Sequence, residues 1–236
     1  MRVLIKRGSG AAGQRVSLDD AEVHHLRVRR ARHQEKVEVL DGVGLKASGQ
    51  LIQDGRQWLV ELGPVEREDP PPQLILAVGA GDRERFSWLV EKAVELGVTR
   101  MVPLETAHTV GVATRLKPNH LPRLRQSVLD VLKQCGSAWA PTIEEPLPLD
   151  QFLQRPFKAP GWLADHSGDT VPSELDSTPL TIVVGPEGGF TESERMDILE
   201  AGYSPVTLGP HTLRFETAAL AAAALASQAR LRRSHA

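Results

Sequence analysis

The sequence predicts an α/β protein in which a small β-rich domain precedes a larger domain built on a parallel sheet. Short runs with period-two alternation fill the first 68 residues, and a run of three prolines follows them. From there to the end of the chain, strand-like and helix-like apolar segments alternate. Such alternation is typical of a parallel sheet with helices on both faces. We therefore predict one domain over residues 1–68 and a second over residues 73–236.

The N-terminal domain is predicted from alternating segments that end in turn residues. "KVEVLDG" (36–42) alternates apolar and polar side chains and ends in Asp-Gly, which is a hairpin signal, and "QWLVELG" (57–63) behaves similarly. A small β-barrel or curled sheet is the expected outcome. The prolines of "EREDPPPQ" (66–73) cannot donate ladder hydrogen bonds and favour an extended spacer, so we place the domain boundary there.

The second domain opens with "LILAVG" (74–79), a continuous apolar run of the kind found in strands buried on both faces. A helix is predicted over 83–97, closed by Gly97, with an apolar stripe of Phe86, Leu89, Val90, Ala93 and Val94. Further strands are predicted at 100–104, 161–164, 180–184 and 205–208, and further helices at 119–136, 191–202 and 216–231. The second of these helices begins with a capping box from Thr191 to Glu194.

Charge is distributed unevenly along the chain. The net charge is −2, yet residues 1–36 carry nine Lys/Arg against four Asp/Glu, so the remaining residues are acidic. The densest basic piece, "HHLRVRRARHQEK" (24–36), fits either a contact to a phosphate backbone or a solvated helix or strand face. No apolar run reaches the roughly 18 residues that span a bilayer, and no signal peptide is apparent, so a cytoplasmic setting is expected.

Cysteine and tryptophan usage points to structure rather than chemistry. The single cysteine, Cys135, excludes an intrachain disulfide and a multi-cysteine metal site, and we expect it to be a buried structural thiol. No metal is expected, because His24, His25 and His33, which we place in a basic strand region, have no carboxylate or thiol partner with ligand spacing. The expected role of the four tryptophans is core packing, although Trp139 is also suited to stacking on a base.

Two glycine-bearing turns carry the functional signal. "TIVVGPEGGFTESE" (181–194) passes from an apolar run through bare backbone into a helix, and "LGPHTLRFETAAL" (208–220) repeats that pattern. Strand ends of a parallel sheet leave backbone groups free, and helix N-termini point amides outward, so ligands bind there. Glycine lets a flat ligand lie against the main chain. The two turns are expected to form one backbone-lined pocket.

With those two motifs the chain resembles the SPOUT methyltransferases, and within them the ribosomal RNA small subunit methyltransferase E family. The resemblance extends to "HHLRVRRARHQEKVEVLDG" in the N-terminal domain and to "RFSWLVEKAVELGVTRMVPL" in the second. It implies a PUA-like N-terminal β-barrel, a SPOUT α/β domain with a deep trefoil knot, and a homodimer. The implied activity is methylation of N3 of a uridine in 16S ribosomal RNA, with S-adenosylmethionine as the cofactor.

The resemblance also implies where the cofactor and the RNA bind. The expected cofactor-binding residues are Leu163, Ala164, Val184, Gly185, Glu187, Gly188, Gly189, Leu208, Gly209 and Leu213. The RNA-binding residues expected in the barrel are Arg27, Arg29, Arg30 and Arg32. Glu187 is expected either to line the pocket or only to solvate the turn.

Two residues near the second turn are candidates for catalysis. Uracil N3 must lose a proton before it attacks, and a permanent cation favours the anion that results. Arg214 is our candidate for that cation, since arginine does not deprotonate. Glu216 either orients this arginine or accepts a proton; alternatively, it is an acid favoured by the helix N-terminus.

The sequence departs from the family pattern at several cationic positions. Where the family has arginines, this chain has Ala107 and His108, Ser137 and Trp139, and His211, while Asp82 and Arg83 replace a basic-Gly pair. In the first domain, Arg29 replaces a leucine and His33-Gln34 a Pro-Gly turn. These changes leave two other hypotheses: a non-catalytic or altered-specificity RNA-binding protein in ribosome assembly, and a different SPOUT activity such as tRNA ribose methylation. The match over residues 24–42 argues against the latter.

Overall fold

The computed structural model describes residues 1–55, 57–155 and 161–234. The chain divides into two compact units. Unit 1 contains Met1–Pro71 and Leu129–Ala140, and unit 2 contains Pro72–Val128 and Pro141–Ala236. The proline run therefore coincides with the first crossing between units, as the sequence predicts, but the chain later returns to unit 1. Among the described residues, no helix is long and apolar enough to cross a membrane.

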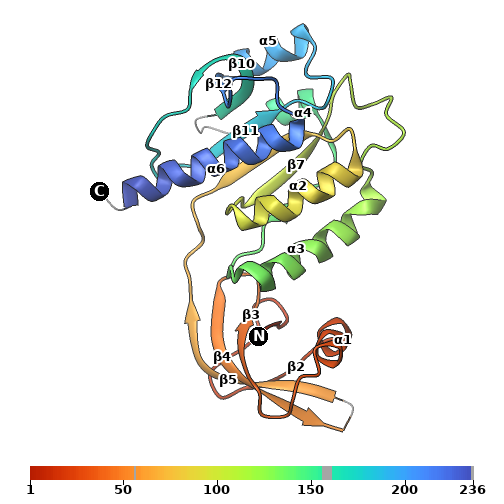
Figure 1. The fold of residues 1–236 in the computed structure, drawn as a ribbon, viewed down its shortest axis with the longest axis vertical. Coiled ribbons are helices and arrows are strands. Elements are labelled where there is room, and N and C mark those ends of the chain that lie inside the picture. Colours follow the sequence, from red (N-terminus) through yellow and green to blue (C-terminus); the bar gives the residue numbers. More distant parts are fainter. Residues whose placement is uncertain (56, 156–160, 235–236) are drawn as a thin grey trace. The chain divides into compact units, whose positions relative to one another are not determined.

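Unit 1 is built on a five-stranded sheet with the order β1-β3-β4-β5-β2 (Figure 1). Its strands are β1 (Arg2–Leu4), β2 (Arg15–Ser17), β3 (Lys36–Leu40), β4 (Leu45–Asp54) and β5 (Gln57–Arg67). β1 runs parallel to β3, and the other neighbours are antiparallel. The alternation predicted around "KVEVL" is confirmed, because Val37 and Val39 point into a core that also holds Trp58.

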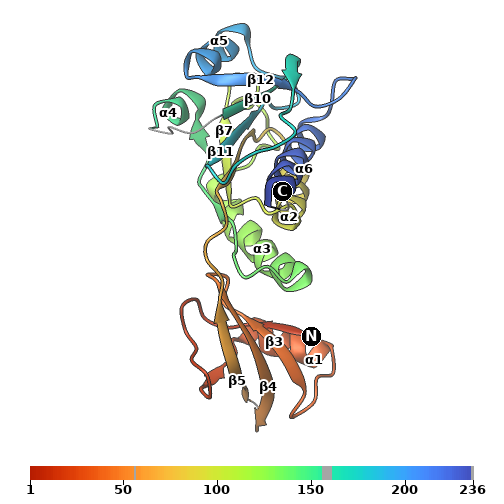
Figure 2. The same ribbon diagram turned by 90° about the vertical axis from the view of Figure 1, so that its left-hand side faces the viewer.

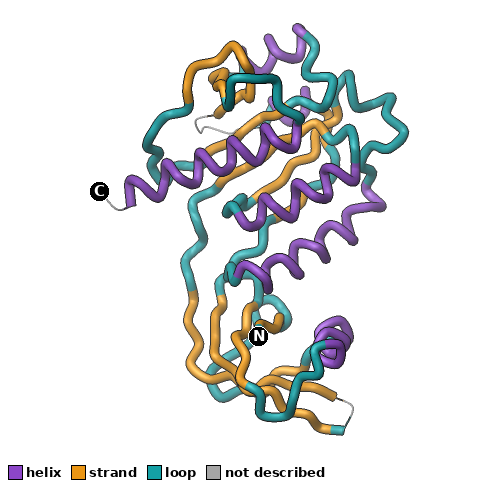
Figure 3. The backbone as a smooth tube through the Cα atoms, in the orientation of Figure 1, coloured by secondary structure: helices purple, strands orange, loops and turns teal. Residues whose placement is uncertain are grey.

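The basic segment of unit 1 forms a helix and not the strand region that we expected around its histidines. Helix α1 spans Asp20–Val28, and the Asp19 side chain caps it by accepting a hydrogen bond from the Glu22 N–H (Figure 3). Val23 and Leu26 bury one face of α1 in the core of unit 1. A spacing of three residues puts both on one side of a helix, which leaves the arginines outside. Because most residues around them are charged, these two apolar residues gave no clear helical pattern in the sequence.

The second half of a long helix completes unit 1. A 3₁₀ turn (Pro118–His120) leads into α3 (Leu121–Cys135), and the part of the chain from Leu129 to Ala140 belongs to unit 1. Within that unit, Lys133 Nζ lies 2.6 Å from Glu22 Oε1, and both side chains are almost fully buried. Trp139 donates from Nε1 to the Glu68 carbonyl over 3.2 Å. The predicted boundaries at 68 and 73 therefore miss this segment.

Unit 2 contains a parallel sheet with the order β12-β10-β11-β6-β7-β8, and β9 also pairs with β7. Its strands are β6 (Leu74–Gly79), β7 (Arg100–Glu105), β8 (Thr142–Ile143), β9 (Leu147–Pro148), β10 (Gly161–Thr170), β11 (Leu180–Val184) and β12 (Tyr203–Thr207). Its other helices are α2 (Arg83–Glu95), α4 (Leu149–Leu153), α5 (Glu192–Glu200) and α6 (Phe215–Ser234). Every residue of β6 is buried, as the continuous apolar run predicts.

Helices cover both faces of this sheet. Figure 2 shows α2 and α6 on one face and α4 and α5 on the other. Side chains alternate between the two layers: Ile75 and Ala77 of β6 join a cluster with Phe152 of α4 and Ile198 of α5. The predicted helix stripe of α2 is confirmed, since all five of its apolar residues are buried. Gly97 and Gly202 follow α2 and α5 with φ of 76° and 92°, the left-handed region that ends helices.

Two expectations about side-chain burial are wrong. Cys135 is exposed at the last residue of α3. Trp88 is half exposed on α2, whereas Trp58 and Trp162 are buried as expected. Neither an isolated cysteine nor an isolated tryptophan carries a periodic signal that would place it on a helix face.

Candidate active site

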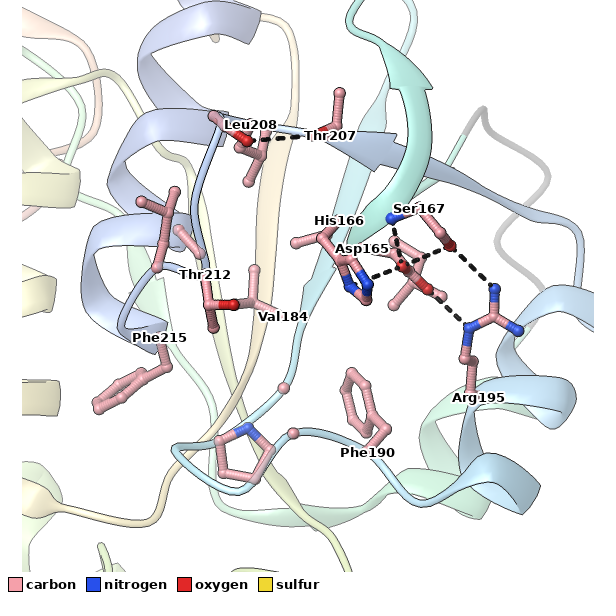
Figure 4. A pocket seen from close by; sticks show the side chains of 18 of the residues that line it. Asp165, His166, Ser167, Val184, Phe190, Arg195, Thr207, Leu208, Thr212 and Phe215 are labelled. Atoms are coloured by element: carbon pink, nitrogen blue, oxygen red, sulfur yellow. Dashed lines mark hydrogen bonds and ion pairs between the residues drawn. The ribbon is translucent and has the colours of Figure 1, made fainter.

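A cavity of about 530 Å³ lies at the carboxyl end of the unit 2 sheet. It lies where β10, β11 and β12 end and where α5 and α6 begin (Figure 4). Its lining comes from three segments, residues 163–167, 184–195 and 207–218, with gaps inside the second and third. Ends of parallel strands are where ligands bind in α/β sheets, because backbone groups there are free of the ladder.

The turn after β11 presents bare backbone to this cavity. Gly189 adopts a φ of 71° and its N–H donates to the Pro186 carbonyl over 2.8 Å, which closes the turn. A Cβ on Gly185 would lie 3.2 Å from the Gly189 backbone, so the two sides of the turn meet without room for a side chain. The capping box predicted for α5 is confirmed: Thr191 and Glu194 bond reciprocally.

A second backbone segment, residues 208–213, passes the same cavity between β12 and α6. Leu208, Gly209 and Leu213 line it, and the side chains of Phe215 and Ala218 extend the wall into the first turn of α6. Ala218 is small and buried, so the helix backbone can stand close to the cavity. The two glycine-bearing turns therefore meet at one cavity, as the sequence predicts.

A loop after β7, two strands away from β11 in the sheet, contacts the first turn. After β7, the His108 Nδ1 lies 2.9 Å from the Gly189 carbonyl, and the Ala107 N–H donates to Glu194 Oε1 over 2.7 Å. The other oxygen of Glu194 accepts from the Thr191 N–H. His108 thus contacts the turn directly.

The third wall comes from an irregularity in β10 that the sequence did not reveal. Its pairing with β12 shifts register between Ala164 and Asp169, so that both residues oppose Val206. Residues 165–168 are therefore bulged out of the ladder. A Cβ on Gly168 would collide with the backbone of Pro205, so a glycine is needed at this position. Bulges re-aim side chains, and here Asp165, His166 and Ser167 face the cavity.

An ion pair anchors this bulge to α5 (Figure 4). Asp165 accepts from Arg195 Nε over 2.7 Å, from the Ser167 N–H over 2.9 Å and from the Ser167 hydroxyl over 2.8 Å. Burial raises the pKa of the Asp165 carboxyl, but the hydrogen bonds from Ser167 and Arg195 outweigh it and lower the pKa to about 2. Asp165 is consequently an anion at neutral pH.

The low pKa of Asp165 predicts a pH-dependent contribution to stability. Because the pKa is lower in the folded protein than the unfolded value near 3.9, the contribution is present above about pH 4 and is lost as the pH falls through about 2. For Asp165→Asn we expect a loss of about 1 kcal/mol at pH 7, allowing for solvent screening, that vanishes near pH 2. Urea denaturation across this pH range measures it. The control is Asp169→Asn on the same strand; a constant difference at every pH would contradict the prediction.

Comparison with known proteins bears on this geometry. A model of the RNA methyltransferase domain matches residues 68–227, and a model of the RNA methyltransferase PUA domain matches residues 18–60. The chain is 32% identical over 217 residues to ribosomal RNA small subunit methyltransferase E of Synechocystis sp., covering 86% of this chain and 69% of the relative. The chain belongs to the ribosomal RNA small subunit methyltransferase E family.

Other members of the methyltransferase E family agree with this assignment. The Aquifex aeolicus protein is 29% identical over 213 residues, covering 87% of this chain and 91% of the relative. A crystal structure of the Neisseria gonorrhoeae methyltransferase E bound to S-adenosyl methionine superimposes with a TM-score of 0.84 at 27% identity, covering 94% of each chain. The predicted fold class, a SPOUT α/β domain with a PUA-like domain, is confirmed; the knot stays a prediction.

The structure places most of the predicted cofactor residues of this methyltransferase E member on the cavity wall. Gly188 is absent from the lining, because it faces the His108 ring, 3.1 Å from the position of its missing Cβ. The other nine predicted residues line the cavity, namely Leu163, Ala164, Val184, Gly185, Glu187, Gly189, Leu208, Gly209 and Leu213.

The two predicted catalytic residues lie outside the residues that line this cavity. Arg214 is exposed just before α6. Glu216 is buried, with Oε1 3.5 Å from the Arg85 guanidinium on α2 and with Oε2 lacking a hydrogen-bond partner among the described residues. The sequence reading missed Asp165, His166, Ser167 and Arg195; the only available signal was the polar "DHSG" directly after the apolar "GWLA".

Proposed function

We propose that this protein transfers the methyl group of S-adenosylmethionine to N3 of a uridine in 16S ribosomal RNA. The observation that carries the proposal is the cavity in which two side-chain-poor turns meet at the end of a parallel sheet. Membership of the methyltransferase E family supports the coarser part, methylation of small-subunit ribosomal RNA. The finer part, the uridine and its N3 atom, rests on the resemblance of the two turns.

The residues of the cavity fit such a donor. A cavity of about 530 Å³ lies within the usual range for small-molecule sites. Apolar walls from Leu163, Val184 and Leu213 suit a flat heterocycle, and the exposed backbone amides and carbonyls of the two turns suit its ring nitrogens and a polar tail. Glu187 and Glu192 add negative charge near the rim, which favours a cationic ligand.

When bound, the donor supplies an activated methyl group on a positively charged sulfur. The protein must then hold the uracil in line with it and favour the loss of the N3 proton. We retain Arg214 as the cation proposed to stabilise the uracil anion, since it is exposed directly beside the lining residue Leu213. For Glu216 the ion pair with Arg85 supports a structural role at the start of α6, rather than proton transfer or orientation of Arg214.

Contacts to the RNA are proposed for the arginines at and after the C-terminal end of α1. Arg27, Arg29, Arg30 and Arg32 are all exposed, and within the described residues their guanidinium groups make no hydrogen bond or ion pair. Cations without internal partners are available to phosphates. Arg30 adopts a φ of 53°, so the chain turns sharply there and the arginines do not stay on one helix face.

A homodimer is part of the proposal. The resemblance places α5 and α6 near the interface, and both helices carry exposed apolar side chains. Met196 of α5 is 44% exposed, while Leu225 and Leu231 of α6 are 41% and 54% exposed. These exposed apolar side chains lie on the two helices that the resemblance assigns to the interface.

The test is transfer to small subunits that lack the modification. We expect labelled methyl groups to enter 16S ribosomal RNA, and nucleoside digestion with mass spectrometry to identify the product as N3-methyluridine. Label in another nucleoside would contradict the proposed position and support altered specificity. Tight donor binding by calorimetry without any label would instead support the non-catalytic alternative.

A further inference from the structure

We propose that His166 is the base that removes the N3 proton from the target uracil, and that Asp165 orients it. This inference rests on the proposed function and adds the group that accepts the proton. The two glycine-bearing turns do not predict this role, because His166 and Asp165 lie on the bulge of β10 and not in either turn.

The bulge places both side chains on the cavity wall. Because residues 165–168 leave the ladder between β10 and β12, consecutive residues 165, 166 and 167 all reach the cavity, which a regular strand would not allow. Figure 4 shows the imidazole of His166 beside the Asp165 carboxylate. The His166 side chain is 88% exposed, so a nucleotide entering from solvent can reach it.

The geometry sets the direction of the imidazole. His166 Nδ1 lies 3.6 Å from Asp165 Oδ1. At 3.6 Å the two atoms are slightly beyond hydrogen-bond distance. Because the ionised carboxylate only accepts hydrogen bonds, it favours the tautomer with the proton on Nδ1, and this tautomer leaves the Nε2 lone pair free. Arg195 and Ser167 hold the carboxylate from its other sides, so it stays in place when the imidazole moves. In many enzymes a base activates the nucleophile, and a third group orients that base.

The other acidic and basic groups around the cavity are less suited to accept a proton. Asp165 is already bonded to Arg195 and Ser167. Glu192 lies on the exposed side of α5, with Oε1 3.5 Å from Arg195 Nη1. Glu187 projects from the first turn over Gly81, and His211 on the second turn has no carboxylate beside it among the described residues. These charges, together with Arg195, form the electrostatic surroundings of His166.

The step balances with the groups named. The N3–H bond breaks and its proton passes to Nε2 of the neutral imidazole, which becomes imidazolium beside the Asp165 anion. The electron pair on N3 forms the bond to the methyl carbon, and the pair of the breaking carbon–sulfur bond remains on sulfur. The imidazolium then returns its proton to water, so no other reactant is needed.

The experiment measures single-turnover methyl transfer from S-adenosylmethionine to unmodified small subunits as a function of pH. For His166→Gln we expect a rate about 100-fold or more below wild type. Donor affinity is measured by calorimetry in parallel, so that the rates are compared at saturating donor. The fall in rate toward acid pH, expected of an imidazole base, should disappear in this variant. Asp165→Asn should slow transfer by roughly 10-fold and change the same acid limb, whereas the matched Asp169→Asn should follow wild type.

Chemical rescue separates a base from a merely structural histidine. His166→Ala should regain activity when imidazole is added, and the recovery should increase with the basicity of substituted imidazoles. A His166→Gln rate within about threefold of wild type, or a loss with an unchanged pH profile and no rescue, would overturn the inference alone. A wild type that binds the donor but forms no N3-methyluridine would overturn the proposed function, and the inference with it.

Discussion

Gly79→Ala is expected to weaken binding of S-adenosylmethionine by about 100-fold or more. Gly79 ends β6, and an added Cβ would lie 2.5 Å from Pro186 Cδ and 2.6 Å from Pro186 N. Backbone cannot yield as a flexible side chain does, so Pro186 must move and carry Gly185 and Gly189 with it. A displacement of about 1 Å in the groups that position a ligand can cost on the order of 10²-fold in the function of a site.

Calorimetric titration of S-adenosylmethionine into the variant measures this effect, and thermal unfolding checks that the fold survives. The matched control is Gly111→Ala, because no atom lies within 4 Å of its added Cβ and its φ is not in the left-handed region. Normal donor affinity in Gly79→Ala would show that the first turn is not part of the donor site.

Lys133→Met is expected to destabilise the protein by roughly 3 kcal/mol or more. The Lys133 ammonium and the Glu22 carboxylate face each other at 2.6 Å with side chains 11% and 5% exposed. Removing one partner leaves a buried charge without compensation, and Glu22 Oε2 already lacks a hydrogen-bond partner among the described residues. Urea denaturation followed by tryptophan fluorescence gives the free energy of unfolding.

Two comparisons test the cause of this loss. In Lys133→Met/Glu22→Met both charges are gone, so most of the stability should return, since apolar pairs of similar volume often replace buried ion pairs. Lys92→Met removes a solvent-exposed pair with Glu95 on α2 and should change stability little. Equal losses in Lys133→Met and in the double variant would refute the buried-charge explanation.

Features that depend on local sequence were predictable. The apolar run of β6, the stripe of α2 and the capping box at Thr191 each follow from residues next to one another, and each is confirmed. The two glycine-bearing turns were also predictable, because glycine and proline act directly on the backbone conformation. Their meeting at one cavity followed from the parallel arrangement of the strands before them.

Features that depend on register or on distant partners were not predictable. The bulge of β10 arises where Ala164 and Asp169 both oppose Val206, a relation that no local pattern encodes. The ion pair of Asp165 with Arg195 joins residues that are 30 positions apart. Glu216 looked like an acid of a helix N-terminus, and only the folded chain brings Arg85 to it.

Sharing of α3 between the two units has a consequence for how the nascent chain folds. During synthesis Leu129–Ala140 leaves the ribosome only after β6, α2 and β7. Until then the N-terminal sheet lacks the ammonium group opposite Glu22 and the indole that bonds to Glu68. Unit 1 is therefore translated first but cannot complete its fold first, because it needs a segment that lies within the sequence of unit 2.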